Sequence, residues 1–460
     1  MINLSNNDES GFRSPRSRRP ISSRDALLSL FELGGYSGSG ENCRNGKANG
    51  KTQWSSPPTA VPSMESEAGA RRIRVGLSTS VIQGGRSGIA RYVLSLLKEF
   101  QRYHDRFQFV IFVLKNDMPL FDFLDSSVQR VEVSERFRRP VADILWHQVI
   151  VPRLAKKHAL DVVHVPSYRR MILRAPCAKV ATIHDLAPFR LSGKYDRARM
   201  IYGRMVARFL ARQQDRIIAV STATAHDIHR FYGSKLDKVT VIHNGIDHRK
   251  FCPGDSAKAR AWVKEHHSIA APFFLYVARF EHPGKNHFRL IEAFDDFKDK
   301  TGLNWQLVLG GSDWHGAETI HHRIRQSPYR DEIHTLGFVS DVDLPDWYRA
   351  AGVFVFPSLF EGFGLPPLEA MACACPVICS TRGSFQEIVG EAASLIDPED
   401  TDALREKMTE LATDDLRRAD FRAKGIAWVK SFTWEGCAAE VLDVYRKAHE
   451  SHVGRHLSRG

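Results

Sequence analysis

The segment FVFPSLFEGFGLPPLEAMACACPVICS, residues 354–380, joins a strand, a glycine-rich turn and a helix in one continuous run. Residues 353–356 are apolar and β-branched or aromatic, which is typical of a buried parallel strand. Pro366 and Pro367 stand where proline is tolerated, in the first turn of a helix. We therefore expect residues 362–365 to open a helix at the C-terminal end of a strand.

Two glutamates, Glu361 and Glu369, flank that expected helix start. The first turn of a helix offers free N–H groups and a positive dipole end to an anion. Glu361 precedes the turn and Glu369 lies about a turn or more into the helix, so their carboxylates reach to opposite sides of the anion. A diphosphate flanked by two sugars, which is a nucleotide-sugar, fits all three features. The alternative is a capped core helix with one exposed glutamate, because short motifs also match by chance.

Short apolar runs alternate with amphipathic stretches from Arg72 onward. The expected strands are residues 73–77, 107–114, 128–133, 161–165, 179–183, 216–220 and 238–242, then 273–278, 306–309, 333–336, 353–356, 376–379 and 394–396. The expected helices of the first half are residues 88–102, 141–158, 194–213 and 222–231. This alternation predicts an α/β fold of two doubly wound parallel-sheet domains, with ligand bound in the cleft between them.

We expect four segments along the 460 residues, a length that exceeds one ordinary domain. Residues 1–70 are rich in Ser, Gly, Asn, Arg and Pro, which indicates a disordered tail. Residues 71–250 form the first domain and residues 251–432 the second, because turn signals cluster at the boundary. Residues 433–460 supply a last helix that packs back on the first domain, followed by a tail.

The formal net charge of the chain is +12. Residues 1–70 hold eight Lys/Arg against seven Asp/Glu, so +11 remains for the rest, much of it between Arg136 and Arg212. Such a balance suits phosphate ligands, nucleic acid or an anionic membrane. No recognised nucleic-acid-binding motif is present, so we expect no nucleic-acid partner. Seven scattered cysteines, with no membrane-spanning run and no signal-peptide pattern, predict a cytoplasmic protein.

Attachment to the inner face of the membrane stays open because of residues 194–213. Arg204, Arg208 and Arg212 recur there at four-residue steps among apolar side chains that include Met205 and Phe209. A basic amphipathic helix of this kind can lie on an anionic membrane. We favour an ordinary outer helix whose apolar face packs on the sheet.

Two cations, Arg279 and Lys285, lie between the strand at 273–278 and the helix expected to follow it. They therefore project from the same C-terminal rim as Glu361. Fixed cations at that rim would neutralise a diphosphate leaving group without a metal. Taken alone they would be solvated surface charges, and their partnership with the Glu361 segment favours a binding site.

Two further candidates follow strands of the first half. Gly85 belongs to the glycine loop at residues 83–92, a phosphate-cradle candidate that lacks Walker or dinucleotide spacing and has a flexible turn as its alternative. His184 follows the strand at 179–183 and could bind a sugar hydroxyl or orient an acceptor, with its proton state tuned by Asp185. A local His–Asp hydrogen bond is the alternative there.

No metal site is expected. Cys373, Cys375 and Cys379 fit small core residues better than metal ligands. Asp341 and Asp343 resemble an Asp-x-Asp metal motif of another transferase fold, but they stand just before a helix and are interpreted as N-capping residues.

The motifs, taken in order, resemble the retaining glycosyltransferases of family four, which have the GT-B architecture of two facing Rossmann-like domains. They are GGRSGIARY, DVVHVPSY, TIHDLAPF, IAVSTATAHDI, VIHNGID, LYVARFEHPGKNH, LVLGG, LGFVSD and FPSLFEGFGLPPLEAMACACPV. The resemblance implies that Arg279 and Lys285 hold the donor diphosphate, while Glu361 contacts the transferred sugar. The further roles it implies are ribose binding by Glu369, phosphate contacts from Gly362, Phe363, Gly364 and Leu365, donor-sugar contact by His184, loop closure at Gly85, and base contacts from the backbone of Phe338 and Val339.

Within that family, GIARY, TIHDLAPF and ARFEHPGKNH are most similar to bacterial mannosyltransferases that build O-antigen and exopolysaccharide chains. GDP-mannose is therefore the first-choice donor, and a glycan or lipid-linked saccharide the acceptor. The implied reaction is a retaining front-face displacement that needs no metal or other cofactor. A nucleotide-sugar epimerase of the same fold and an inactive scaffold homologue are the alternatives.

Overall fold

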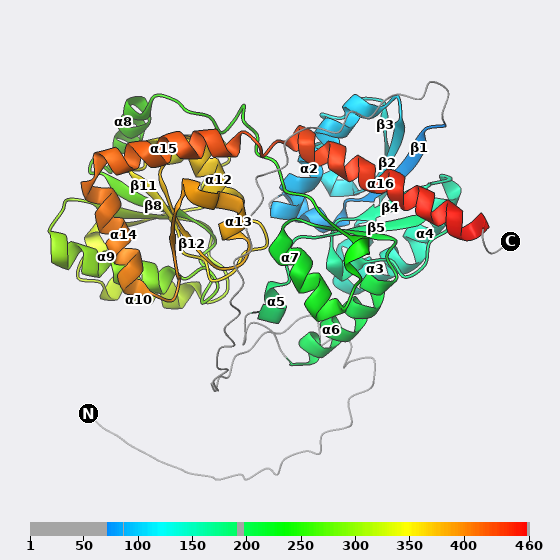
Figure 1. Ribbon diagram of the computed structural model, residues 1–460, viewed down its shortest axis with the longest axis horizontal. Helices are drawn as coiled ribbons and strands as arrows, with labels where there is room; N and C mark the ends of the chain where they lie inside the picture. Colours follow the sequence, from blue (N-terminus) through cyan, green and yellow to red (C-terminus); the bar gives the residue numbers. More distant parts are fainter. Residues whose placement is uncertain (1–70, 86, 191–196, 458–460) are drawn as a thin grey trace, which may run out of the picture.

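The computed structural model describes residues 71–85, 87–190 and 197–457. They form two α/β units that lie side by side, each built around a parallel sheet (Figure 1). The tail expected at residues 1–70 lies outside the described residues, as does the start of the helix expected at residue 194.

The first unit contains a seven-stranded parallel sheet in the order β3-β2-β1-β4-β5-β6-β7. Its strands are β1 (Ile73–Ser78), β2 (Phe107–Leu114), β3 (Val128–Val133), β4 (Val162–Val165), β5 (Ala178–Ile183), β6 (Arg216–Ala219) and β7 (Val239–Val241). The strand order reverses next to β1, so the C-terminal ends of β1 and β4 flank a crevice where doubly wound folds bind ligands.

The second unit contains a six-stranded parallel sheet in the order β10-β9-β8-β11-β12-β13. Its strands are β8 (Phe273–Val277), β9 (Gln306–Gly310), β10 (Ile333–Gly337), β11 (Val353–Phe356), β12 (Val377–Ser380) and β13 (Ser394–Ile396). The order reverses between β8 and β11, and Arg279 and Glu361 follow these two strands. The two-sheet α/β fold expected from the sequence is therefore confirmed.

Helices connect the strands within each unit. In the first they are α2 (Gly88–Phe100), α3 (Pro140–Leu145), α4 (Val151–Lys157), α5 (Ala187–Arg190), α6 (Arg197–Arg212) and α7 (Thr222–Asp227), with short turns η1 (Ser80–Gly85), η3 (Lys115–Phe121), η4 (Glu135–Arg138) and η6 (Tyr168–Arg170). In the second they are α8 (Ser256–His267), α9 (His287–Thr301), α10 (Ala317–Gln326), α11 (Leu344–Ala350), α12 (Leu365–Ala372), α13 (Phe385–Val389), α14 (Thr401–Thr413) and α15 (Asp415–Val429).

Two expected helices are interrupted. The helix expected at 141–158 is divided by a π-helical turn, η5 (Trp146–Ile150), and the helix expected at 222–231 changes to a π-turn at η7 (Ile228–Tyr232). Such turns widen a helix locally and re-aim its side chains. In the first case His147 is turned inward, where it is fully buried against Ser78.

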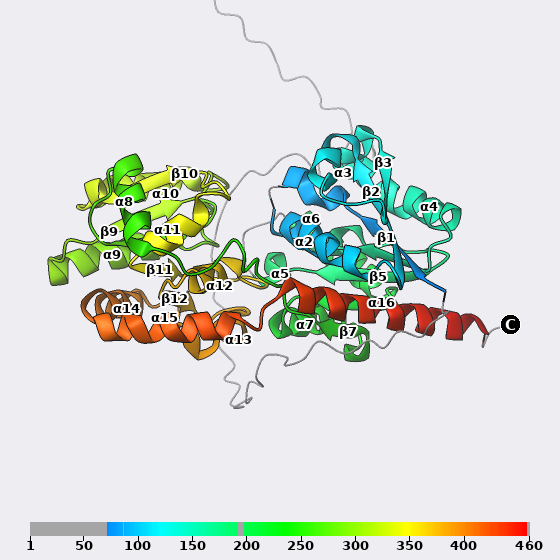
Figure 2. The same cartoon turned by 90° about the horizontal axis from the view of Figure 1, so that it is seen from above.

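The last helix, α16 (Trp434–Leu457), lies along the first unit although it follows the second in sequence (Figure 2). Its buried residues, among them Cys437, Leu442 and Tyr445, belong to the same hydrophobic cluster as Val75 and Phe109 of the first sheet. The Tyr445 hydroxyl also lies 2.7 Å from His164 Nδ1 on β4. The chain therefore crosses between the units twice.

The outer helix α6 exposes apolar side chains. Ala207 and Ala211 are buried, whereas Met205 and Phe209 are 68% and 52% exposed. The favoured expectation that this apolar face packs on the sheet is wrong for those two side chains, because the small alanines occupy the contact instead. None of the described helices is long and apolar enough to cross a membrane.

Candidate functional site

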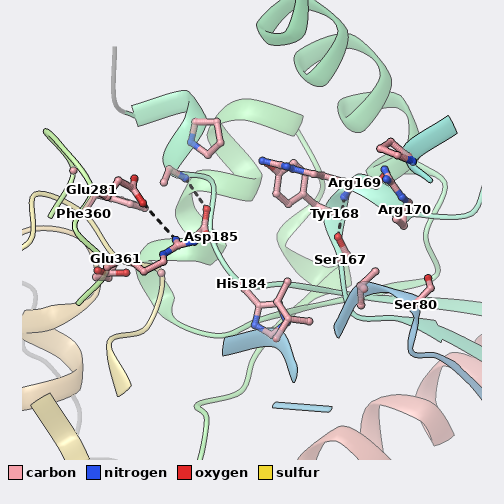
Figure 3. A pocket seen from close by; sticks show the side chains of 18 of the residues that line it. Ser80, Ser167, Tyr168, Arg169, Arg170, His184, Asp185, Glu281, Phe360 and Glu361 are labelled. Atoms are coloured by element: carbon pink, nitrogen blue, oxygen red, sulfur yellow. Dashed lines mark hydrogen bonds and ion pairs between the residues drawn. The ribbon is translucent and has the colours of Figure 1, made fainter. Parts of the chain in front are cut away.

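A cavity of about 410 Å³ lies between the two units, a size suited to a small ligand. Its walls come from the segments that follow β1, β3, β4 and β5 in the first unit and β8 and β11 in the second. Figure 3 shows Ser167, Tyr168, Arg169 and Arg170 on one side, and Glu281, Phe360 and Glu361 on the other, with His184 and Asp185 between them. The switch points of both sheets thus open into one space.

Lys285 and Glu361 form an ion pair on the second-unit wall. Lys285 lies in the loop before α9, and its neighbour Gly284 accepts a backbone hydrogen bond of 3.0 Å from Leu359 N. This bond ties the loop after β8 to the loop after β11. The pair is therefore held at the cavity by backbone contacts as well as by charge.

Arg279 lines the same wall and is more open to solvent. Its Nη2 lies 3.4 Å from Glu281 Oε2, and its guanidinium lies 5.0 Å from the centre of the Trp314 ring. Its side chain is 56% exposed. An exposed guanidinium beside a partly buried ammonium places two cations at one wall, an arrangement that suits a diphosphate.

The glycine turn before α12 touches the first unit directly. A Cβ at Gly362 would stand 1.7 Å from the carbonyl oxygen of His184, so no other residue fits there. The Gly362 carbonyl accepts hydrogen bonds from Ser221 Oγ at 2.7 Å and from Thr224 Oγ1 at 3.3 Å. Gly364 has a φ of +93° and precedes the helix, whose first turn contains both prolines. The expected helix start is thus present, and it is hydrogen-bonded to the facing unit.

His184 lines the cavity, and burial lowers its pKa to about 4. The ring is hydrogen-bonded to the Pro166 carbonyl, and its Nε2 has no hydrogen-bond partner among the described residues. The expectation that Asp185 tunes this histidine is wrong, because the Asp185 carboxylate accepts the Ala187 N–H at 3.1 Å instead. His184 is therefore neutral at physiological pH.

Glu369 does not line the cavity but lies buried at the boundary between the units. It forms an ion pair with Arg91 of α2, and it accepts a 3.3 Å hydrogen bond from the Tyr348 hydroxyl. Burial raises the pKa of Glu369 although Arg91 opposes this effect. Arg91 also contacts Asp341 at 3.0 Å, and Lys250 contacts the same carboxylate at 3.5 Å.

The residues expected to bind a donor are therefore divided. Those at the cavity are His184, Arg279, Lys285, Glu361 and Gly362, and those outside its lining are Gly85, Phe338, Val339, Phe363, Gly364, Leu365 and Glu369. Phe338 follows β10 and is 70% exposed, whereas Phe363 is buried. Gly85 has a φ of +86° in η1, the turn that also brings Ser80 to the cavity.

Several lining residues were not singled out from the sequence: Ser80, Arg138, Asp143, Ser167, Tyr168, Arg169, Arg170, Glu281 and Phe360. For those from Ser167 to Arg170 a signal existed, because they follow the predicted strand β4 at its C-terminal end. For Arg138 and Asp143 none did, since they come from an edge turn and a short helix that reach the cavity only through tertiary packing.

The sites discounted from the sequence have ordinary roles. Cys373, Cys375 and Cys379 are buried core residues with pKa values raised by burial. Asp343 occupies the N-cap position of α11, but its side chain makes no capping bond and accepts from Ser340 Oγ at 2.7 Å, which corrects that expectation. Across the described ranges, no three His, Cys, Asp or Glu side chains gather as metal ligands would.

Two family profiles match the chain over most of the described residues. Residues 86–250 match the profile described as Glycosyltransferase Family 4, and residues 263–428 match the one described as Glycosyl transferases group 1. The two matches fall on the first and second units in turn.

Curated relatives agree with these profiles. The chain is 30% identical over 267 residues to O-antigen chain mannosyltransferase B of Escherichia coli, covering 58% of this chain and 70% of that protein. It is 31% identical over 249 residues to a D-inositol 3-phosphate glycosyltransferase of Xylanimonas cellulosilytica, covering 52% and 59%. Against the serotype-specific mannosyltransferase WbdA of E. coli it is 28% identical and spans about a third of that longer protein.

Solved structures share the fold at low sequence identity. Sucrose-phosphate synthase from Thermosynechococcus elongatus aligns with a TM-score of 0.66 and 21% identity, over 83% of this chain and all of that one. Anabaena HepE, solved with UDP and glucose, aligns with a TM-score of 0.65 and 18% identity, over 81% and 99%. These likenesses are of fold alone.

Proposed function

Because the chain belongs to the family 4, group 1 glycosyltransferases and has their GT-B fold, we propose that it moves a hexose from a nucleotide-sugar to a hydroxyl of a glycan or lipid-linked saccharide, with retention of configuration. Mannose from GDP-mannose is the proposed donor, since two relatives are named as mannosyltransferases. The reaction takes place in the cytoplasm, at or near the inner face of the membrane.

One observation carries this proposal: Lys285, Glu361, Arg279 and the Gly362 turn meet at a single cavity between the units. The two cations and the start of α12 face the place where negative charge grows as a diphosphate leaves. Glu361 accepts hydrogen bonds from the hydroxyls of the transferred sugar, while its ion pair with Lys285 holds the carboxylate in place. Glu369 is the proposed partner of the ribose hydroxyls.

The proposed chemistry is a front-face displacement. The acceptor oxygen forms a bond to the anomeric carbon on the face from which the diphosphate departs, and the bond between that carbon and the diphosphate oxygen breaks. The acceptor proton moves to the departing diphosphate. A double displacement would need a free carboxylate nucleophile at the anomeric carbon, and the ion pair with Lys285 makes Glu361 poorly suited to that role.

His184 serves as a neutral hydrogen-bond partner in this scheme. Because its pKa is about 4, the ring is neutral near pH 7, and its unpartnered Nε2 can accept a hydrogen bond from a sugar hydroxyl. Arg279 and Lys285 take the charge-neutralising role that a divalent cation has in other transferases. We therefore expect transfer to proceed unchanged in the presence of EDTA.

The test combines binding with turnover. Thermal unfolding is followed with GDP-mannose, UDP-glucose, UDP-GlcNAc and dTDP-rhamnose, because a ligand that binds the folded state raises its apparent stability. The stabilising donor is then incubated with saccharide acceptors, with and without EDTA. Transfer with retained configuration supports the proposal. Conversion of the donor without acceptor to an epimer, or failure of every nucleotide-sugar to bind, would overturn it.

A further inference from the structure

The first-unit wall of the cavity carries three arginines, Arg138, Arg169 and Arg170. Two of them are labelled in Figure 3, on the side opposite Glu361. They come from two separate turns, η4 and η6, so the grouping arises from the fold and not from one basic run. The donor chemistry proposed above uses none of them.

Arg170 is fixed by a chain of buried polar groups. Its Nε donates to Asp143, which also accepts from Ser80 Oγ at 3.1 Å. Behind Asp143, His147 places Nδ1 3.2 Å from the carboxylate and Nε2 2.9 Å from Ser78 Oγ. Burial raises the pKa of Asp143, but its bonds to His147 and Arg170 outweigh that effect and hold the pKa below its usual value. The anchor therefore stays ionised.

The other two guanidinium groups are also held. Arg138 donates through Nε to Glu135 at 2.7 Å and through Nη2 to Asp117 at 3.1 Å. Arg169 lies over the Tyr168 ring, 5.4 Å from its centre, and donates to the hydroxyl at 3.0 Å. A guanidinium offers five N–H donors. The bonds of Arg138 run through Nε and Nη2, so its Nη1 is left for a ligand.

The balance of charge differs between the two walls. Among the lining residues, the second-unit wall has two cations against two carboxylates, and the first-unit wall has three arginines against two carboxylates, while Asp117 and Glu135 pair with Arg138 from outside the lining. His184, between them, is neutral. The surrounding residues 135–174 contain nine Lys/Arg against three Asp/Glu. Structural ion pairing explains the anchors, but not the gathering of three guanidinium groups on one cavity wall.

We propose that the acceptor carries a phosphate group and that Arg138, Arg169 and Arg170 bind it while a hydroxyl elsewhere on the acceptor faces the donor sugar. This proposal rests on the proposed glycosyltransfer. Arginine suits it because its planar fork pairs with phosphate oxygens through two parallel hydrogen bonds. The phosphate takes no part in bond breaking, so the arginines determine which acceptor binds.

The experiment compares matched acceptors with the donor identified by thermal shift. Mannose, glucose, galactose, N-acetylglucosamine and myo-inositol are each offered free and as the monophosphate, and a short polyprenyl diphosphate-linked saccharide is offered in detergent. We expect kcat/KM at least tenfold higher for a phosphorylated acceptor than for its neutral counterpart. A preference for a sugar monophosphate would show that the phosphate belongs to a soluble acceptor. A preference for the polyprenyl diphosphate-linked saccharide would show that it belongs to a lipid-linked one.

Three variants test the residues. In Arg138→Met and Arg170→Met the preference for the phosphorylated acceptor should fall to about twofold or less, and Arg170→Lys should restore part of it. Arg174→Met is the matched control, because Arg174 is exposed nearby and does not line the cavity. Arg138→Met remains informative if Arg170→Met fails to fold, since Arg138 has anchors other than Asp143.

Equal use of neutral and phosphorylated acceptors by the unaltered protein would overturn the proposal, as would a preference that persists in Arg138→Met and in any Arg170 variant that folds. Neither result would affect the proposed glycosyltransfer, which fails if no nucleotide-sugar binds or if the donor is converted to an epimer without acceptor.

Discussion

Glu361 and Glu369 belong to one short segment, yet the fold gives them opposite surroundings. Glu361 lies at the cavity and pairs with Lys285 of its own unit. Glu369 is buried away from the cavity and pairs with Arg91 of the facing unit. Both carboxylates are thus paired, but Glu361 faces the cavity, while Glu369 is held away from it by a side chain from across the boundary.

The difference arises from the helix between them. Glu361 precedes α12 and follows the end of β11, so it stands at the sheet edge where ligands bind. Glu369 is inside α12, on a face covered by Tyr348 of α11 and by Arg91. A ribose that takes the Glu369 oxygens must displace Arg91. The donor binding proposed at Glu369 would therefore be coupled to the ion pair between the units, whereas Glu361 pairs with a side chain of its own unit.

The largest expected effect is on the Glu361 side. Glu361→Gln keeps the shape of the side chain but removes its charge, so the sugar loses a charged hydrogen-bond acceptor and Lys285 loses its partner. We expect kcat to fall by about 10²–10³, the loss typical of a charge-stabilising group. Initial transfer rates at saturating donor measure this.

Glu399→Gln is the control for that change, because Glu399 is an exposed glutamate of the same unit that pairs with Arg382 at 2.8 Å. It should retain full activity. Near-normal turnover by a folded Glu361→Gln protein would remove Glu361 from the reaction and end the contrast between the two glutamates.

A smaller and opposite effect is expected on the Glu369 side. Arg91→Met frees the carboxylate for the ribose, so the affinity for the nucleoside diphosphate alone should rise about three- to tenfold, because the competing contact no longer has to be broken. Titration calorimetry measures this change. Transfer should become slower, because the units lose a cross-boundary ion pair.

Arg102→Met serves as the control, since Arg102 pairs with Glu99 and Glu435 and does not touch the second sheet unit. The double variant Arg91→Met, Glu369→Gln should bind more weakly than Arg91→Met alone, which would show that the gain runs through Glu369. Unchanged or weaker binding in Arg91→Met would mean that Arg91 supports the donor instead of competing with it.

The contrast also shows what the sequence can predict. Strands such as β2 and β11 were predicted to the residue, because a parallel strand buried on both faces is a continuous apolar run. Arg279, Lys285 and Glu361 were predicted as neighbours, because each follows a strand whose end faces the cleft. Burial of Glu369 by Arg91 was not predicted, since a partner so distant in sequence leaves no local pattern.

The prediction of uninterrupted helices was wrong for a related reason. The period of residues 141–158 predicts one helix, but Asp143 and His147 engage Arg170 and Ser78, which are remote in sequence. These tertiary bonds coincide with the π-turn, and they also hold Arg170 at the first-unit wall of the cavity. Local propensity cannot report them, because they depend on which loops the folded chain brings together.

A modest effect on stability is expected from the backbone contact at Gly362, which lies next to Glu361. Ser221 caps α7 through the Thr224 N–H at 3.1 Å and also donates to the Gly362 carbonyl across the boundary. Ser221→Ala should lower the free energy of unfolding by about 1–2 kcal/mol for the cap and by about 1 kcal/mol more for the second bond. Urea unfolding measures the total.

Ser87→Ala is the matched control, because Ser87 caps α2 through the Ala90 N–H at the same 3.1 Å and makes no bond to the second unit. The difference between the two variants isolates the contact at Gly362. Equal losses would mean that this contact contributes nothing to stability.

The smallest expected effect on turnover is from His184, which lies against the Gly362 turn. Its pKa is about 4 when folded and near 6.5 when unfolded. The ring therefore stays neutral between pH 5.5 and 8.5, and the profile of kcat against pH should show no inflection that His184→Asn removes. Stability behaves differently: the unfolded chain binds the extra proton as pH falls from about 6.5 towards 4, so the free energy of unfolding should decrease across that range. An inflection of kcat near pH 6.5 that disappears in His184→Asn would mean that the imidazole carries a proton and is not a neutral hydrogen-bond partner. The reaction would then depend on His184 as well as on the two glutamates.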